Sequence, residues 1–471
     1  MSIRSAGPTV RGSRSRAQRQ PPARHTDPAD LFVHLYDAVP EAVFLGDEAA
    51  RLSEDKDVRA ETERVTRAVL ATGEVDAQMW DLPADSSHDS VAFARLIGLD
   101  NVLRHVHPKS VAPPPRSLRR LAARQISTGR FNSDEKDGLL LPRLVGYGAP
   151  PHRPHKHESF SVIRIAPQSL DKVEFTSIPN VHLPTLRRDD QLTVACLPFL
   201  NSADDIMFAT EARFGIVRYQ LAPSSSPDLI ERIDPAIESL DQSGAVIGLL
   251  PEGALSGALL DVWKKRLRAT SGRRSNLAIV IVGSGPVTDG KPPPNRAVAL
   301  TRHGQELWSQ DKLCDFTLVS AATKQWGFAD IHGQNAFEDI TRGEKLVVVE
   351  TNAGRFAILI CEDLQRSDTR HVVPRDFGVT HIFSPVFDAP LDEKRWERFA
   401  AERHLQWGGS RVAVSNSRVV GNPHGTDDAI LTSIGVVPKS EPGTWDCDVQ
   451  LGFTRLSTDA PVLRLPAADF Q

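Results

Sequence analysis

The sequence predicts an α/β protein with an additional, mostly helical amino-terminal domain. From Gln191 onward, short apolar runs alternate with amphipathic stretches of helix length, which is typical of a layered α/β fold. Earlier, from Ala29 to Val75, apolar residues recur at spacings of three and four, which indicates helices. The length of 471 residues suits about three domains, or one large domain with an extension.

The composition is that of an ordinary globular protein. Charged residues make up 25% of the chain and apolar residues 40%, while 56 Lys and Arg against 60 Asp and Glu leave a net charge of -4. This balance gives no argument for a nucleic-acid or membrane partner. The longest apolar runs, such as Leu277 to Val282, are far shorter than the roughly 18 residues of a membrane span. We therefore expect a cytoplasmic protein without a membrane partner.

Three segments are predicted along the chain. Residues 1–30 carry several arginines among Ser, Gln, Pro and Gly, which favours a disordered basic tail over a secretory signal. Residues 31–185 are predicted to form the mostly helical domain, whose role the sequence does not reveal, and residues 186–465 the α/β domain. Helical spacing continues through Ser90–Val106 and Ser117–Ser127, and short apolar runs at Phe160–Ile165 and Val173–Phe175 predict strands.

A proline-rich loop around residues 148–157 contains His152, His155 and His157. Imidazoles bind zinc or nickel, but this loop lacks an acidic or cysteine partner at a recognisable spacing. We therefore expect a solvated loop and no metal site.

The alternation from residue 191 onward predicts strands and helices in a regular succession. The predicted strands are Leu192–Leu197, Ala245–Leu250, Leu277–Val282, Ala297–Thr301, Leu346–Glu350, Phe356–Ile360, His381–Ser384 and Arg411–Ser415. The predicted helices are Asp228–Asp241, Gly257–Thr270, Thr369–Phe377 and Asp392–Trp407.

The four cysteines lie far apart and form no C-x-x-C pair. This excludes a disulfide framework and a zinc ribbon, and it favours a reducing compartment. We interpret Cys196 and Cys314 as packing residues and Cys447 as a loop or surface residue. Cys361 differs from them because it follows a glycine turn and a buried strand.

Three strand ends in the α/β region carry reactive side chains. The run Ala245–Leu250 leads through a proline to Glu252, and the segment from Asn295 leads through a His-Gly turn to Lys312. The run that begins at Arg355 ends in Cys361. A carboxylate, an ammonium and a thiol are therefore predicted to meet at one edge of a sheet.

These groups suit nucleophilic attack on an amide or nitrile carbon. A desolvated carboxylate could take the proton of the thiol. A lysine beside the thiol would favour the thiolate and stabilise an oxyanion, for which the backbone N–H of Glu362 is a second donor. Each residue alone also has an ordinary interpretation: a buried cysteine, a turn carboxylate and a surface lysine. Lys324 is the competing lysine, but it lacks a preceding strand, turn and strand, so Lys312 is favoured.

The order Glu, Lys, Cys resembles the nitrilase, or carbon–nitrogen hydrolase, superfamily. The resemblance rests on Leu249-Leu-Pro-Glu252, on Asn295 to Lys312 and on Ile358-Leu-Ile-Cys-Glu-Asp363. Flanking segments agree with it over about residues 186–460. They are Gln191–Phe199, Thr351–Arg355, Trp396–Asn416 and Ser433–Pro438.

The resemblance implies an α-β-β-α sandwich that pairs with another copy. It implies Glu252 as general base, Lys312 as oxyanion stabiliser and Cys361 as the nucleophile that forms a thioester. Many members have a second glutamate between lysine and cysteine, and Glu338 is the candidate here, whereas Glu344 is interpreted as a turn residue.

The chain also departs from the pattern of the family. The helix after the nucleophile reads Arg403-His-Leu-Gln-Trp407, which keeps the arginine but not the acid or the asparagine of many members. Cys-Glu-Asp-Leu resembles the glutaminase part of glutamine-dependent NAD synthetases, yet no ATP-using domain follows. The segment Asn201–Pro223 is expanded, which suggests a lid or a contact with the amino-terminal region.

The sequence therefore predicts an amidase-type hydrolase that cleaves a non-peptide carbon–nitrogen bond in an amide, carbamoyl compound or nitrile and needs no cofactor. Its expected partners are a small-molecule amide-type substrate, a second copy of the chain and a protein bound by the amino-terminal domain. Two alternatives stay open. One is a regulatory or partner-binding protein with a dormant or complex-activated triad, and the other is a soluble acyltransferase.

Overall fold

The computed structural model describes the chain in segments. They are residues 26–44, 48–84, 87–108, 110, 112–144, 156–179, 181, 183, 191–326, 331–366, 376–389, 391, 393–401, 403–404, 409–420, 432–438, 447–449 and 462–466. Most of the predicted tail lies outside them, as do His152, His155 and most of the predicted helix Thr369–Phe377.

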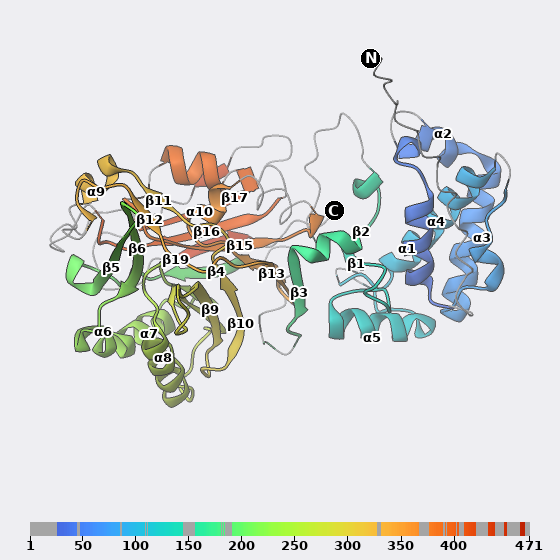
Figure 1. Cartoon of the computed structure of the whole chain (residues 1–471). Helices are drawn as coiled ribbons and strands as arrows, with labels where there is room; N and C mark the ends of the chain where they lie inside the picture. Colours follow the sequence, from blue (N-terminus) through green and yellow to red (C-terminus); the bar gives the residue numbers. More distant parts are fainter. Residues whose placement is uncertain are drawn as a thin grey trace, which may run out of the picture.

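The amino-terminal part is helical, and its helices share one apolar cluster. Asp55 caps α3 by accepting the N–H groups of Asp57 and Val58, and Gly73 ends that helix at a φ of 79°. The elements are α1 (Pro28–Ala38), η1 (Glu41–Phe44), α2 (Glu48–Glu54), α3 (Lys56–Thr72), η2 (Ala77–Trp80), α4 (His88–Arg104), η3 (Arg116–Leu118) and α5 (Arg119–Thr128). Figure 1 shows them at the end of the molecule away from α6–α8.

A two-stranded hairpin follows these helices. Strand β1 (Leu139–Pro142) pairs antiparallel with β2 (Val162–Ile165), and the short helices η4 (Lys156–Glu158) and η5 (Pro167–Asp171) flank β2. Leu140 lies in the cluster of the helices, whereas Leu139 belongs to the core of the large sheets. Because neighbouring strand residues point to opposite faces, the hairpin contacts both cores.

Two large sheets form the rest of the architecture. One has the order β10-β9-β8-β7-β4-β19 and the other β18-β17-β16-β15-β14-β13-β3. The first consists of β4 (Gln191–Cys196), β7 (Ile247–Leu249), β8 (Ile279–Pro286), β9 (Asn295–Thr301), β10 (Glu306–Asp311) and β19 (Val462–Pro466). The second consists of β3 (Val173–Ser177), β13 (Leu346–Thr351), β14 (Gly354–Ile358), β15 (His381–Val386), β16 (Arg411–Asn416), β17 (Ser433–Pro438) and β18 (Cys447–Val449). All eight strands predicted from the alternation are present.

The two sheets share one apolar core, and helices lie outside them. Ile279 and Ile281 of β8 belong to the shared core, whereas Val280 and Val282 belong to the cluster that contains α7 and α8. Alternate residues of one strand therefore face the second sheet and the helices. The helices on this side are α6 (Pro227–Glu231), α7 (Ile233–Gln242) and α8 (Gly257–Ala269). The predicted helix Asp228–Asp241 is thus two helices that meet at Arg232.

On the other side, the short helix α10 (Glu362–Gln365) contacts η9 (Glu393–Ala401), a π-helix within the predicted helix Asp392–Trp407. Trp396 of η9 lies in the shared core. The observed class is therefore a mixed α/β fold with helices and paired sheets.

A third sheet was not predicted. It has the order β11-β12-β6-β5 and consists of β5 (Ile206–Arg213), β6 (Ile216–Pro223), β11 (Thr317–Leu318) and β12 (Ala336–Glu338). The helix α9 (Ser320–Trp326) connects β11 to the segment before β12. The expanded segment Asn201–Pro223 therefore contains the hairpin β5–β6, with its turn at Phe214 and Gly215.

The predicted boundary at residue 185 separates two strands that belong to the large sheets. Strand β3 precedes it and pairs in parallel with β13, so a strand of the amino-terminal part forms one edge of the seven-stranded sheet. The division of the chain into domains stays a prediction.

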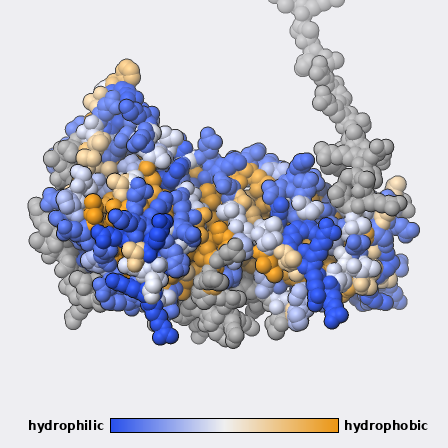
Figure 2. Space-filling model, turned by 90° about the horizontal axis from the view of Figure 1, so that it is seen from below, coloured by the Kyte–Doolittle hydropathy of each residue, from blue (hydrophilic) through white to orange (hydrophobic). Residues whose placement is uncertain are grey.

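On the face that Figure 2 shows, hydrophilic side chains predominate toward both ends and hydrophobic ones appear between them. Among the described residues, no helix combines the length and the apolar character that crossing a membrane requires.

Candidate active site

Glu252 lies just beyond β7, where the chain leaves the six-stranded sheet. Its backbone forms a single bridge with Ser284 of β8, and its N–H donates to the carbonyl of Val386 at 3.3 Å. The side chain is 3% exposed. The backbone therefore fixes this carboxylate between the two large sheets.

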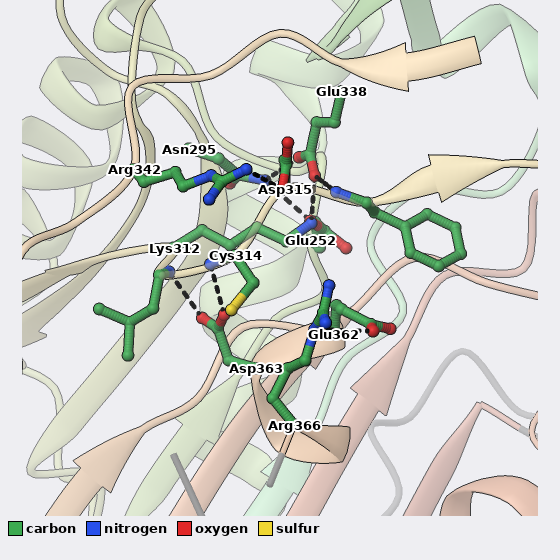
Figure 3. A network of polar contacts seen from close by, with 12 residues as sticks. Glu252, Asn295, Lys312, Cys314, Asp315, Glu338, Arg342, Glu362, Asp363 and Arg366 are labelled. Atoms are coloured by element: carbon green, nitrogen blue, oxygen red, sulfur yellow. Dashed lines mark hydrogen bonds and ion pairs between the residues drawn. The ribbon is translucent and has the colours of Figure 1, made fainter. Parts of the chain in front are cut away.

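Lys312 follows β10 and is the cation of the site. Its ammonium donates to Glu252 Oε1 at 2.8 Å and to Glu338 Oε2 at 2.7 Å, as Figure 3 shows. Its side chain is 2% exposed. The competing Lys324 is an exposed residue of α9.

Glu338 ends β12 and completes a buried group of four side chains. The amide nitrogen of Asn295 donates to Glu252 Oε1 at 2.8 Å and to Glu338 Oε1 at 3.1 Å (Figure 3). The backbone N–H of Phe316 donates to Glu338 Oε2 at 2.9 Å. Two carboxylates, one ammonium and one amide are thus joined by direct hydrogen bonds, while the amide oxygen of Asn295 has no partner among the described residues. Glu344, by contrast, is exposed, in agreement with its interpretation as a turn residue.

Cys361 lies after β14, at the start of α10. Its backbone has φ 49° and ψ -107°, a conformation that non-glycine residues rarely adopt, and its N–H donates to the carbonyl of Pro385 at 2.9 Å. Strained backbone of this kind is common at active sites. The thiol is 5% exposed and interacts electrostatically with Glu252 and Lys312. The structure therefore brings together the three side chains predicted at strand ends.

The electrostatics of the site favour a protonated resting thiol. Burial raises the pKa of Cys361 well above its usual value, and the charge of Glu252 adds to this effect. Lys312 and the backbone N–H of Phe387 lower the pKa of the thiol, but they do not outweigh burial. Lys312 therefore favours the thiolate, as expected, but burial has the larger effect and the resting thiol stays protonated.

The pKa values of Lys312 and Glu338 both lie above their usual values. Burial alone would lower the pKa of Lys312, but the charges of Glu252 and Glu338 outweigh it. For Glu338, burial raises the pKa more than Lys312 lowers it. The lysine therefore remains an ammonium over the whole physiological range.

The two residues after Cys361 have different surroundings. Glu362 forms an ion pair with Arg366 at 3.2 Å, and burial raises the pKa of its carboxyl. Asp363 is fully buried and accepts the backbone N–H groups of Leu313 at 3.0 Å and Cys314 at 2.9 Å (Figure 3). Asp363 thus joins the turn of the nucleophile to the segment that follows Lys312.

Sequence reasoning missed Asn295 and Asp363 as members of this network, and it missed the strand that carries Tyr219, a buried residue that interacts electrostatically with the site. Asn295 begins a strand and Asp363 lies two residues after Cys361. Both residues belong to the segments that carry the family resemblance, but the sequence assigned neither of them a role. Tyr219 lies on β6, where apolar residues at 217, 219 and 221 alternate with polar ones. This alternation is the signal that could have predicted the strand.

The remaining cysteines and histidines form no second site in the described part of the chain. Cys196 is buried in β4, and Cys314 is half-buried. The side chain of His157 lies 3.4 Å from Glu158. Among described residues, no group of three or more His, Cys, Asp or Glu side chains could hold a metal ion.

No protein-family model and no curated protein matches the sequence. Solved structures do match. A crystal structure of an amidase from Nesterenkonia sp. has 15% sequence identity and a TM-score of 0.36, over 60% of this chain and 93% of that one. A cysteine-to-alanine mutant of the Nesterenkonia AN1 amidase, described as a member of the nitrilase superfamily, has 16% identity and the same TM-score and coverage. Both of these solved structures are described as amidases.

Proposed function

We propose that this protein is a nitrilase-superfamily hydrolase that cleaves the carbon–nitrogen bond of a small amide, carbamoyl compound or nitrile through a cysteine thioester. The observation that carries the proposal is the buried group of Glu252, Lys312 and Glu338, with Cys361 in electrostatic contact with it. These four side chains come from four separate strand ends, and a structural core alone does not require ionised groups there.

For an amide, the first half of the reaction forms the thioester. Glu252 takes the proton of Cys361 as the sulfur attacks the carbonyl carbon, and the oxyanion is held by the ammonium of Lys312. Glu252 then returns the proton to the nitrogen, the carbon–nitrogen bond breaks, and ammonia or an amine leaves. Because the resting thiol is protonated, transfer to Glu252 accompanies attack.

The second half of the reaction removes the acyl group. Glu252 takes a proton from water, the hydroxide oxygen attacks the thioester carbon, and Lys312 again holds the oxyanion. The carbon–sulfur bond breaks, the sulfur recovers a proton and the carboxylic acid leaves. Glu338 keeps Lys312 fixed and charged in both halves, and the backbone N–H of Glu362 is the second oxyanion donor in this proposal.

The test is the release of ammonia or an amine from a panel of amides, N-carbamoyl compounds and nitriles. We expect turnover by the unchanged protein and loss of at least about a thousandfold in Cys361→Ala, because the nucleophile is gone. Cys314→Ser is the matched control, since its thiol lies outside the buried group and its backbone contact to Asp363 is kept. Equal turnover by the Cys361→Ala protein would exclude the proposal.

Mass spectrometry separates the two alternatives from hydrolysis. An acyltransferase would form the Cys361 thioester but release acid only slowly until an amine acceptor is added. A dormant, regulatory triad would form no thioester with any member of the panel.

A further inference from the structure

Strand β6 of the third sheet packs directly against the candidate active site. A Cβ built on Gly253, the residue after Glu252, would lie 3.0 Å from the side chain of Leu221. Leu221 is on the buried face of β6, together with Tyr219 two residues earlier. The hairpin β5–β6 therefore reaches the turn that carries Glu252.

Tyr219 is next to Glu338 on this sheet. The two residues are paired in the parallel register of β6 and β12, so their side chains point to the same face. The carbonyl of Tyr219 accepts the N–H of Asp339 at 2.8 Å, and its ring packs against Phe208 at 5.7 Å. These contacts fix the ring on the side of the site where Glu338 holds Lys312.

The hydroxyl of Tyr219 has no hydrogen-bond partner within the described part of the protein. The residue is 4% exposed, yet its hydroxyl makes no hydrogen bond to any described residue. It interacts electrostatically with Glu338, Lys312, Glu252 and Cys361. Burial and the neighbouring carboxylates raise the pKa of the phenol, which therefore keeps its proton and can donate a hydrogen bond.

We infer that Tyr219 binds the substrate by donating a hydrogen bond to the oxygen of the reacting carbonyl, beside the contact from Lys312. The inference rests on the proposed function. Two hydrogens of the Lys312 ammonium are already donated to Glu252 and Glu338, which leaves one for the oxyanion. The neutral phenol of Tyr219 would supply a further hydrogen-bond donor to the carbonyl oxygen, which Lys312 also contacts. The leaving nitrogen would instead lie next to Glu252, which returns the proton to it.

The test compares Tyr219→Phe with the unchanged protein on an amide and on an ester of the same acyl group. We expect kcat/KM to fall on the order of 10- to 100-fold for both substrates, because both develop the same oxyanion. The thermal unfolding midpoint should stay unchanged, because the hydroxyl has no partner within the described protein. Tyr36→Phe is the matched control, since Tyr36 lies in α1 and packs on Phe160 far from the site.

A second readout does not need turnover. Chloroacetamide carries a carbonyl oxygen that the Tyr219 hydroxyl would hold, whereas methyl methanethiosulfonate carries none. In Tyr219→Phe, the labelling of Cys361 by chloroacetamide should slow severalfold while the labelling by methanethiosulfonate keeps its rate. A hydroxyl that only supported packing would change both rates together.

Each other outcome overturns the inference in a recognisable way. Unchanged kinetics and labelling in Tyr219→Phe, with an active parent protein, would overturn the role of Tyr219 alone. A fall in kcat/KM for the amide but not for the ester would place the hydroxyl at the leaving nitrogen. A lowered thermal unfolding midpoint would show that the hydroxyl stabilises the fold through a contact within the protein. A parent protein that neither hydrolyses the panel nor labels at Cys361 would overturn the proposed function and this inference with it.

Discussion

Two carboxylates surround the single ammonium of Lys312, and this excess of negative charge keeps the lysine protonated and fixed in place. Its ammonium lies between the carboxylates of Glu252 and Glu338, and all three side chains are at most 4% exposed. Ionised groups at such depth are stable only when each has its partners. Asn295 supplies the additional donor, because its single amide group bonds both carboxylates. The network keeps one ammonium hydrogen available for substrate.

Asp363 should make stability depend on pH. Burial raises its pKa to about 7, although the N–H groups of Leu313 and Cys314 partly oppose this. Because the folded state binds the proton more tightly than the unfolded chain, this carboxyl stabilises the protein fully below about pH 4. That contribution is lost as pH rises from about 4 to 7. Asp363→Asn should remove this part of the slope, about 1 kcal/mol per pH unit.

The measurement is urea unfolding of both proteins between pH 4 and 8. The Asp363→Asn variant loses a hydrogen-bond acceptor, so we expect it to be less stable at every pH. The quantity to compare is therefore the slope of the free energy of unfolding against pH, not the free energy itself. Parallel stability curves for the two proteins would contradict the raised pKa. Glu211→Gln, at an exposed position on β5, is the control for the loss of a carboxylate.

At the scale of single residues, the sequence predicted where the reactive groups stand but not their environment. Glu252, Lys312 and Cys361 could be found because each follows an apolar run of strand length, and Glu338 was found through the family resemblance. The protonated thiol could not be predicted, since it depends on how deeply three separate strand ends are buried together. Asn295 was missed because its two acceptors come from distant positions.

At the scale of elements, Arg355 holds the beginning of the strand that leads to Cys361. Its guanidinium is fully buried and donates to Glu350 Oε2 at 2.6 Å, to the carbonyl of Pro142 at 3.0 Å and to that of Phe377. Arg355→Met should therefore destabilise the protein by about 3–5 kcal/mol, because Glu350 would remain buried without its cation.

The double variant Arg355→Met with Glu350→Leu is the matched comparison. It should be more stable than Arg355→Met alone, because no buried charge is left unpaired. Denaturant unfolding of the three proteins measures this. A double variant at least as unstable as the single one would show that the carbonyl contacts, and not the charge of Glu350, determine the cost.

The accuracy of the sequence-based prediction also differs among the elements. Strands of the two large sheets were predicted because their apolar runs are buried on both faces. Strands β5 and β12 were missed for a different reason. Only one face of β5 is partly buried, and β12 is three residues long and is a strand only because β6 and β11 pair with it. Pairing between distant segments is not visible in local periodicity.

At the scale of the whole molecule, the amino-terminal part and the large sheets share structure across the predicted boundary. Strand β3 forms the edge of the seven-stranded sheet beside β13, and the hairpin β1–β2 packs against both apolar clusters. Arg355 adds a hydrogen bond to Pro142 of β1. The first 185 residues therefore contribute to the stability of the part that carries the site.

A chain that starts at residue 186 should for this reason be much less stable than one that starts at residue 26. Removing residues 1–185 would expose the edge of β13, where β3 now pairs with residues such as Leu346, and would remove the apolar residues that β1–β2 contribute to the shared core. An uncovered sheet edge promotes aggregation. We expect the shorter chain to elute as aggregate in size-exclusion chromatography and to unfold at a lower temperature, whereas the chain from residue 26 behaves like the full-length protein. If the shorter chain were monodisperse and equally stable, the α/β part would not need β3 to complete its sheet.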